Sequence, residues 1–278
     1  MVIVANSLAQ PRYVATIHPI KEILQNVVGE RGTVETIMPP GASPHTYEMK
    51  PSDIQRVNSA DALFSGDEHL DHWSHEFNNP NSIEIFSLVP GEFRLEITSH
   101  FGRNKNKSLG EDPHFWTDPL TVKALLPHLV KTLTELDPAG GENYEENAAR
   151  FAASLDELSA KIAHMLRPVA GQKVLLSHPF LQYFLNRYSI NLRGIIETIP
   201  GTEPTPRDIS EIIKQVKKEK IKIILVHPQH SVRPAQLIAE STNCTIIKLD
   251  PLGGTPGRTT YAELIEYNAK RILEALVN

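Results

Sequence analysis

Four side chains of types that commonly bind metal ions occupy comparable places in the sequence. His45, His178 and Asp250 each follow a short segment rich in β-branched residues, and His114 stands in "EDPHFWTDP" between two Asp-Pro dipeptides. Proline restricts its own φ and the residue before it, so this histidine is held in a stiff, non-helical loop. Three imidazoles and one carboxylate suit a tetrahedral Zn²⁺ site. Because the four residues are far apart along the chain, only tertiary structure can bring them together.

Short β-branched segments alternate with segments of helical periodicity in both halves of the chain, which favours α/β architecture with parallel sheets. Strands are expected at 13–17, 33–38, 60–65, 173–177, 222–226 and 245–249. Open α/β sheets bind ligands at the carboxyl ends of their strands. The candidate metal ligands that follow these segments are therefore expected at such ends.

The length of 278 residues predicts two lobes. Between the halves, apolar residues of the segment 142–166 recur at helical spacing. Such a helix would be roughly 35 to 40 Å long and could traverse both lobes. We expect two Rossmann-like lobes, 1–138 and 168–278, joined by a linker helix, 139–167, with the metal site in the cleft between them.

Composition excludes several classes of function. The 28 Lys and Arg are balanced by 33 Asp and Glu, for a net charge of −5, and no basic block argues for nucleic acid as a partner. No apolar run reaches the roughly 18 residues of a membrane span. The single cysteine, Cys244, allows no internal disulfide. The small residues "SLA" before Gln10 suggest an exported chain with a trimmed signal peptide, and the chain does not begin with a lipid-anchoring cysteine.

Several segments carry a resemblance to a known family. "PPGASPHTYEMKPSD", "EDPHFWTDP", "LLSHPFLQYF", "IIETIPGTEPTPRDISEIIK" and "LDPLGG" occur in the order typical of the metal-binding solute receptors of bacterial ABC importers. This family, the cluster A-I receptors, has zinc and manganese branches, and some members were once called adhesins. The resemblance spans about residue 13 to the end of the chain. It implies two Rossmann-like lobes, one long connecting helix and a metal ion buried between the lobes.

Carried over by residue, the family's ligands match His45, His114, His178 and Asp250. The manganese branch typically has a carboxylate at the third position, so histidine there favours zinc. The resemblance implies a periplasmic or otherwise extracytoplasmic zinc receptor, expected to be monomeric, that delivers transported Zn²⁺ to an ABC permease and is not an enzyme. Zinc members often have a histidine-rich loop before the second ligand, whereas the segment 99–113, predicted to be a mobile loop, has one histidine, His100.

Three alternatives remain open. The first is a manganese or iron receptor of the same family. The second is a zinc hydrolase in which Asp250 acts as a base, although the chain has no "HExxH", no Gly-rich phosphate loop and no "GxSxG". The third is a surface adhesin in which the metal only stabilises the fold.

The remaining histidines have secondary roles in this interpretation. His69, His72 and His75 recur every third residue and form either a weak second metal site or, by preference, a solvated face. His18 follows a strand and is expected to pack near the cleft, and one of His227 and His230 is a candidate to line it. A metal-bound imidazole usually donates its second N–H to a carboxylate or carbonyl. The candidate carboxylates near the predicted ligands are Glu48, Asp112 and Asp118.

Overall fold

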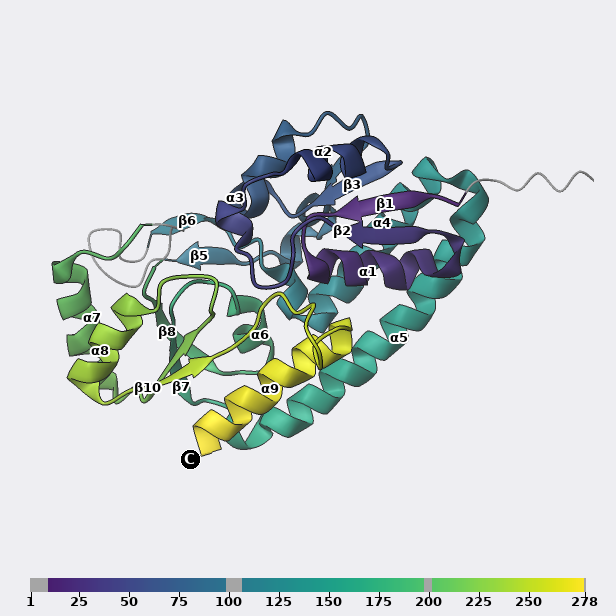
Figure 1. Ribbon diagram of the computed structural model, residues 1–278. Coiled ribbons are helices and arrows are strands. Elements are labelled where there is room, and N and C mark those ends of the chain that lie inside the picture. The colour runs from purple at the N-terminus through teal and green to yellow at the C-terminus, as the bar shows by residue number, and fades with distance from the viewer. Residues whose placement is uncertain (1–9, 99–106, 198–201, 278) are drawn as a thin grey trace, which may run out of the picture.

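The computed structural model describes residues 10–98, 107–197 and 202–277. Two parallel α/β lobes lie next to each other, and the long helix α5 (Gly141–Leu166) runs diagonally along both of them (Figure 1). This arrangement confirms the predicted fold class. The expectation of a trimmed signal peptide at 1–9 concerns residues outside the described ranges. The predicted mobile loop at 99–113 lies outside them at 99–106, and in its described part Ser108–Glu111 forms a strand, β6, where a loop was expected.

The first sheet has four parallel strands in the order β2-β1-β3-β4. Its strands are β1 (Arg12–Ala15), β2 (Thr33–Thr36), β3 (Ala62–Ser65) and β4 (Ser82–Glu84). The predictions at 13–17, 33–38 and 60–65 are confirmed with shorter bounds. Strand β4 was not predicted because its three residues contain a single β-branched side chain. The helices of this lobe are α1 (His18–Val28), α2 (Pro51–Asn58), α3 (Glu68–Asp71) and α4 (Pro119–Leu136).

The second sheet also has four parallel strands, in the order β10-β9-β7-β8. Its strands are β7 (Lys173–Leu176), β8 (Asn191–Ile195), β9 (Ile223–Val226) and β10 (Thr245–Lys248). Sequence reasoning missed β8, "NLRGI", because Arg193 and Gly194 interrupt its apolar pattern. The helices are α6 (Gln182–Arg187), α7 (Pro206–Glu219), α8 (Arg233–Thr242) and α9 (Tyr261–Val277). A separate antiparallel pair, β5 (Glu96–Thr98) and β6 (Ser108–Glu111), flanks residues 99–107.

Helix α5 confirms the predicted helix at 142–166 and explains how one element can join two lobes. It has 26 residues and is therefore about 39 Å long at the usual rise per residue. It packs against α1 and α4 of the first lobe and against α9 of the second. Its buried face is lined by the residues that gave the helical period, Tyr144, Ala148, Phe151, Leu155, Leu158 and Ile162. The division into lobes 1–138 and 168–278 itself stays a prediction.

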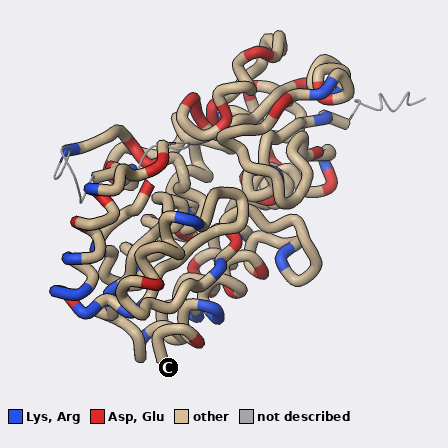
Figure 2. The backbone as a smooth tube through the Cα atoms, turned by 60° about the vertical axis from the view of Figure 1, so that its left-hand side comes forward, with Lys and Arg blue, Asp and Glu red and all other residues tan. Residues whose placement is uncertain are grey.

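The surface carries both signs of charge. Acidic positions are spread over the chain, and basic positions gather toward one side in the view of Figure 2 without forming a continuous stripe there. Within the described ranges, no helix combines the length and apolar character that a membrane crossing needs.

Candidate metal centre

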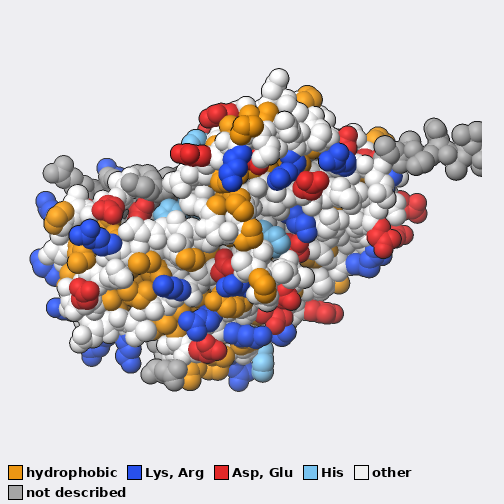
Figure 3. Space-filling view, viewed as in Figure 1, with side chains coloured by type: hydrophobic (Ala, Val, Ile, Leu, Met, Phe, Trp, Pro, Cys, Tyr) orange, Lys and Arg blue, Asp and Glu red, His pale blue; other side chains and the backbone are white. Residues whose placement is uncertain are grey.

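The folded chain places each predicted ligand at the carboxyl end of a strand or in the loop that faces such ends. His45 lies in a 3₁₀ turn, Pro44–Thr46, beyond β2, and His114 immediately precedes the 3₁₀ turn Phe115–Thr117. His178 lies two residues beyond β7, in the other lobe. Little histidine is visible on the face of the molecule shown in Figure 3. The side chains of His114 and His178 are almost completely buried, in agreement with that view.

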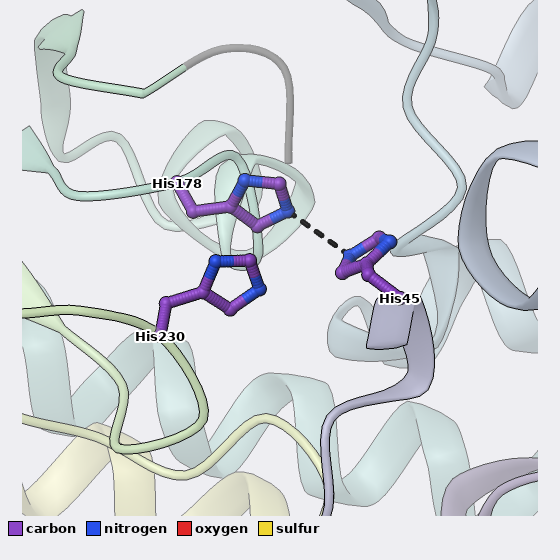
Figure 4. A group of neighbouring side chains, drawn as sticks. All are labelled: His45, His178 and His230. Carbon is purple, nitrogen blue, oxygen red and sulfur yellow. Dashed lines mark hydrogen bonds between the residues drawn. The ribbon is translucent and has the colours of Figure 1, made fainter. Parts of the chain in front are cut away.

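Three of the four predicted residues come together. The ring centroids of His45 and His114 are 5.9 Å apart, those of His114 and His178 are 5.3 Å apart, and those of His45 and His178 are 5.0 Å apart. Nε2 of His178 lies 3.2 Å from Nε2 of His45 (Figure 4). With zinc–nitrogen bonds of about 2.0–2.1 Å, two ligands of a tetrahedral site are about 3.3 Å apart. The two nitrogens are thus already spaced as a single tetrahedral ion requires.

Asp250 is engaged elsewhere in this structure. Its Oδ1 accepts hydrogen bonds from the backbone N–H groups of Leu252 and Gly253, both at 3.0 Å, and its Oδ2 lies 3.3 Å from Nε of Arg258. Among the described residues, no hydrogen bond or ion pair joins this carboxylate to His45, His114 or His178. The carboxylate instead shapes the turn at Gly253, whose φ of +70° is a conformation that favours glycine. Its role as a ligand stays a prediction.

Two further histidines complete the cluster. The ring of His230 stacks on that of His178, with centroids 4.8 Å apart, and lies 5.5 Å from that of His45. The ring of His227 lies 4.7 Å from that of His230 and 5.8 Å from that of His178. Sequence reasoning gave these two histidines a secondary place. The signal was nevertheless there, because both follow β9 and therefore obey the same strand-end rule as the predicted ligands.

The histidines from the first lobe are oriented by hydrogen bonds at Nδ1. The Nδ1 of His114 lies 2.6 Å from Oδ1 of Asp112, and that of His45 lies 3.1 Å from the carbonyl oxygen of His69. With Nδ1–H as the donor in both rings, the Nε2 lone pairs remain free for a metal. Asp112 thus contacts the imidazole of His114 as expected, while the role of His114 as a metal ligand stays a prediction.

The other carboxylates proposed for this role do something else. Asp118 accepts from the N–H of Leu120 at the start of α4 and forms a paired contact with the guanidinium of Arg187. Glu48 is exposed. Of the three carboxylates chosen for their proximity in sequence, one contacts a clustered imidazole, because the direction of each side chain depends on the local backbone.

His69, His72 and His75 lie at the surface, as the preferred interpretation of a solvated face expects. His69 lies in the short α3, and His72 and His75 lie in the 3₁₀ helix that follows it. All three side chains are exposed, and Nε2 of His75 pairs with Glu84 at 2.8 Å. His18 packs as expected, with its Nε2 3.0 Å from the carbonyl oxygen of Thr259.

Burial keeps the imidazoles of His45, His178 and His227 neutral. Desolvation, followed by the charges of neighbouring histidines, lowers the pKa of His45 to about 2. The same causes lower the pKa of His227 to about 3 and that of His178 well below its ordinary value. At neutral pH these rings therefore carry unprotonated nitrogens, the form that binds a metal.

Comparison with known proteins shows the family of this chain. A family model described as zinc-uptake complex component A, periplasmic, matches residues 14–275. The chain belongs to this family. Its members are solute-binding receptors and not enzymes, which removes the hydrolase alternative and confirms the resemblance found in the sequence.

Relatives of this chain differ in the metal that their names mention. The chain is 25% identical over 260 residues to the zinc-binding protein AdcA of Streptococcus pyogenes, which covers 87% of this chain and 50% of that protein. It is 26% identical over 262 residues to the manganese-binding lipoprotein MntA of Halalkalibacterium halodurans, covering 92% and 85%. The chain thus spans about half the length of AdcA.

A solved structure of ZnuA superposes with a TM-score of 0.79 at 25% identity, covering 96% of this chain and 99% of that one. Two lobes joined by a long helix are therefore shared with a receptor of the same family.

Proposed function

We propose that this chain is an extracytoplasmic, monomeric receptor that binds one Zn²⁺ ion as cargo and delivers it to the permease of an ABC importer. The observation that carries the proposal is the convergence of His45 and His114 from one lobe with His178 from the other. Burial lowers the pKa values of His45 and His178, and their Nε2 atoms are 3.2 Å apart. Family membership supports the delivery step, since an importer needs a receptor that presents its cargo.

The choice of zinc rests on the ligand atoms. Imidazole nitrogen suits zinc, whereas manganese prefers carboxylate, carbonyl and water oxygens. The manganese-binding relative keeps a manganese receptor as the second candidate. The three imidazoles at the site argue against a manganese receptor.

Asp250 is retained as a proposed fourth ligand on the strength of the family resemblance. To reach the ion, its carboxylate would have to leave Arg258 and the two N–H groups of its own turn. That rearrangement costs hydrogen bonds to a charged group, each worth roughly 1.5–3 kcal/mol.

We expect metal entry to involve loops more than a wide opening of the lobes. Helix α5 packs against helices of both lobes and resists a large hinge motion. The loop of His114, next to the segment 99–113, is the expected route. Crystal structures with and without zinc should differ mainly in these loops, and a large rotation of one lobe against the other would contradict this mechanism.

The test is metal content and zinc titration against a chelating dye for wild type, His45→Ala, His178→Ala and Asp250→Ala. His164→Ala, an exposed histidine of α5, is the matched control. We expect one zinc per chain and tight zinc binding in wild type and control. The zinc affinity should be about a hundredfold or more lower in His45→Ala and His178→Ala. Each of four ligands contributes about a quarter of the 10–16 kcal/mol of binding free energy of such a site. Absence of stoichiometric metal in wild type would overturn the proposal, and tighter binding of manganese than of zinc would favour the second candidate.

A further inference from the structure

His230 meets the geometric conditions for a ligand of the same ion. One nitrogen from each of His45, His178 and His230 lies within 4.8 Å of the other two. Figure 4 shows His178 and His230 one above the other on one side, with both rings directed toward His45 on the other side. An ion held between His45 and His178 would therefore lie beside the ring of His230.

A buried polar atom points to a missing partner at this position. The side chain of His230 is 9% exposed, and its Nε2 is buried with no hydrogen-bond partner among the described residues. Buried polar atoms in native proteins are nearly always paired. A metal ion in the cluster would give this nitrogen the partner that it lacks.

Sheet topology explains why His230 lies beside His178. The strand order β10-β9-β7-β8 makes β9 the direct neighbour of β7, and His230 follows β9 as His178 follows β7. Asp250 follows β10, which is one strand farther away. Adjacent strands are about 4.8 Å apart, so the extra strand roughly doubles the lateral distance from His178.

We infer that His230 is a ligand of the ion bound by His45, His114 and His178, which gives a coordination sphere of four imidazole nitrogens. The inference rests on the proposed function and puts His230 in the fourth position, which Asp250 holds in the family resemblance. It also deepens the choice of cargo, because a sphere without oxygen ligands selects Zn²⁺ over Mn²⁺ more strongly than one with a carboxylate.

Glu197 is the residue that would position this ligand. Its Oε1 lies 3.8 Å from Nδ1 of His230, and its backbone N–H donates to the carbonyl oxygen of Ser177 beside His178. The carboxylate is buried and the side chain of His230 is 9% exposed. A closer approach of this carboxylate to Nδ1 would favour the tautomer that leaves Nε2 free for the metal, the arrangement usual for metal-bound histidines.

The test compares His230→Ala and His230→Gln with Asp250→Ala and with the exposed control His164→Ala, using the purified full chain. Zinc affinity is measured by competition with a chelating dye, and the visible absorption of bound Co²⁺ reports on the ligand atoms. We expect both His230 variants to lose at least about tenfold in zinc affinity and to change the Co²⁺ spectrum. Asp250→Ala tests the alternative in which the carboxylate, and not His230, holds the fourth position. The glutamine variant keeps a side chain of similar size, and circular dichroism of the metal-free variants shows whether the fold is retained.

The outcomes separate this inference from the proposed function. Failure of wild type to bind zinc would overturn both. If wild type binds zinc and His178→Ala weakens it, but folded His230 variants keep wild-type affinity and spectrum, the inference alone is wrong. A changed spectrum in Asp250→Ala, with none in the His230 variants, would assign the fourth position to the carboxylate.

Discussion

The two walls of the metal centre are built differently. On the first-lobe wall, His45 and His114 each have Nδ1 hydrogen-bonded to an oxygen, at 3.1 Å and 2.6 Å. On the second-lobe wall, Nδ1 of His178 and Nε2 of His230 are buried with no hydrogen-bond partner among the described residues. The first wall therefore has its imidazoles oriented before metal arrives, whereas on the second wall Nε2 of His230 would gain a partner when an ion binds.

Because of this difference, the first wall is preorganised for binding an ion. Oriented rings can take up an ion with little further reorganisation, which lowers the cost of binding. The second wall supplies Nε2 of His230, an unpartnered nitrogen that the proposed ion would pair with. Metal should thus order the second wall more than the first.

Zinc removal is expected to have the largest effect. At a zinc concentration of about a thousand times Kd, binding stabilises the folded chain by about 4 kcal/mol, and this is lost on chelation. Hydrogen exchange should accelerate more in 177–181 and 227–232 of the second wall than in 44–47 and 112–117 of the first. The metal-free chain should remain folded, because an extensive buried hydrophobic core extends through both lobes. Global unfolding on chelation would instead support a metal that only stabilises the fold.

Asp112→Asn should weaken zinc binding by about 10- to 100-fold, because the amide cannot stabilise the metal-bound imidazole of His114 as the carboxylate does. Glu197→Gln should cost less, since its oxygen lies 3.8 Å from His230 and not 2.6 Å. Both are measured by dye competition. Asp118→Asn is the control, because it removes charge from a helix start and a pair with Arg187 and should lower stability but not affinity. Equal losses of zinc affinity in Asp112→Asn and Glu197→Gln would contradict the difference between the two walls.

The free energy of unfolding of the metal-free chain should decrease as the pH is lowered from 7 to 5, because of the buried histidines. The folded pKa of His227 is about 3, so between the unfolded pKa of about 6.5 and pH 3 the unfolded chain binds a proton that the folded chain does not. From pH 7 to pH 5 this costs about 2 kcal/mol for that one ring. Burial raises the pKa of Asp71 to about 7, which has the opposite sign.

The contribution of His227 is isolated by comparing wild type with His227→Asn in chelator by urea unfolding at both pH values. The term from Asp71 is the same in both proteins and cancels. The wild type should lose about 2 kcal/mol more than the variant. The exposed His128→Asn serves as control and should behave as wild type. If the stability of wild type and His227→Asn changed equally between the two pH values, His227 would take up its proton as readily in the folded chain as in the unfolded chain.

The smallest effect is expected from the contact that ties the His114 loop to the second lobe. Tyr261 of α9 donates its hydroxyl to the carbonyl oxygen of Trp116 at 2.7 Å. Tyr261→Phe should lower stability by about 1 kcal/mol with little change in zinc affinity. Tyr267→Phe, at a half-buried position of the same helix, is the control. A loss of affinity comparable to that of Asp112→Asn would mean that this tether, and not Asp112, orients His114.

Local patterns in the sequence were sufficient to predict many of the strands and the long helix of this molecule. β-branched segments predicted the longer strands, and the apolar period of 142–166 predicted α5, because both depend on neighbours within a few residues. The rule that ligands lie beyond strand ends selected His45 and His178 correctly as members of one cluster. Motif order identified the family, because several short motifs in sequence are unlikely to coincide by chance.

Tertiary structure decided what lies at the site besides these residues. The order of strands within a sheet is set by packing between distant segments, and it is this order that puts His230, and not Asp250, next to His178. The partner of each imidazole was likewise decided by the fold: Asp112 faces His114, while Asp118, four residues from the same histidine, faces Arg187. Residue types and spacing determined which side chains could bind a metal, whereas the three-dimensional path of the backbone determined which of them meet.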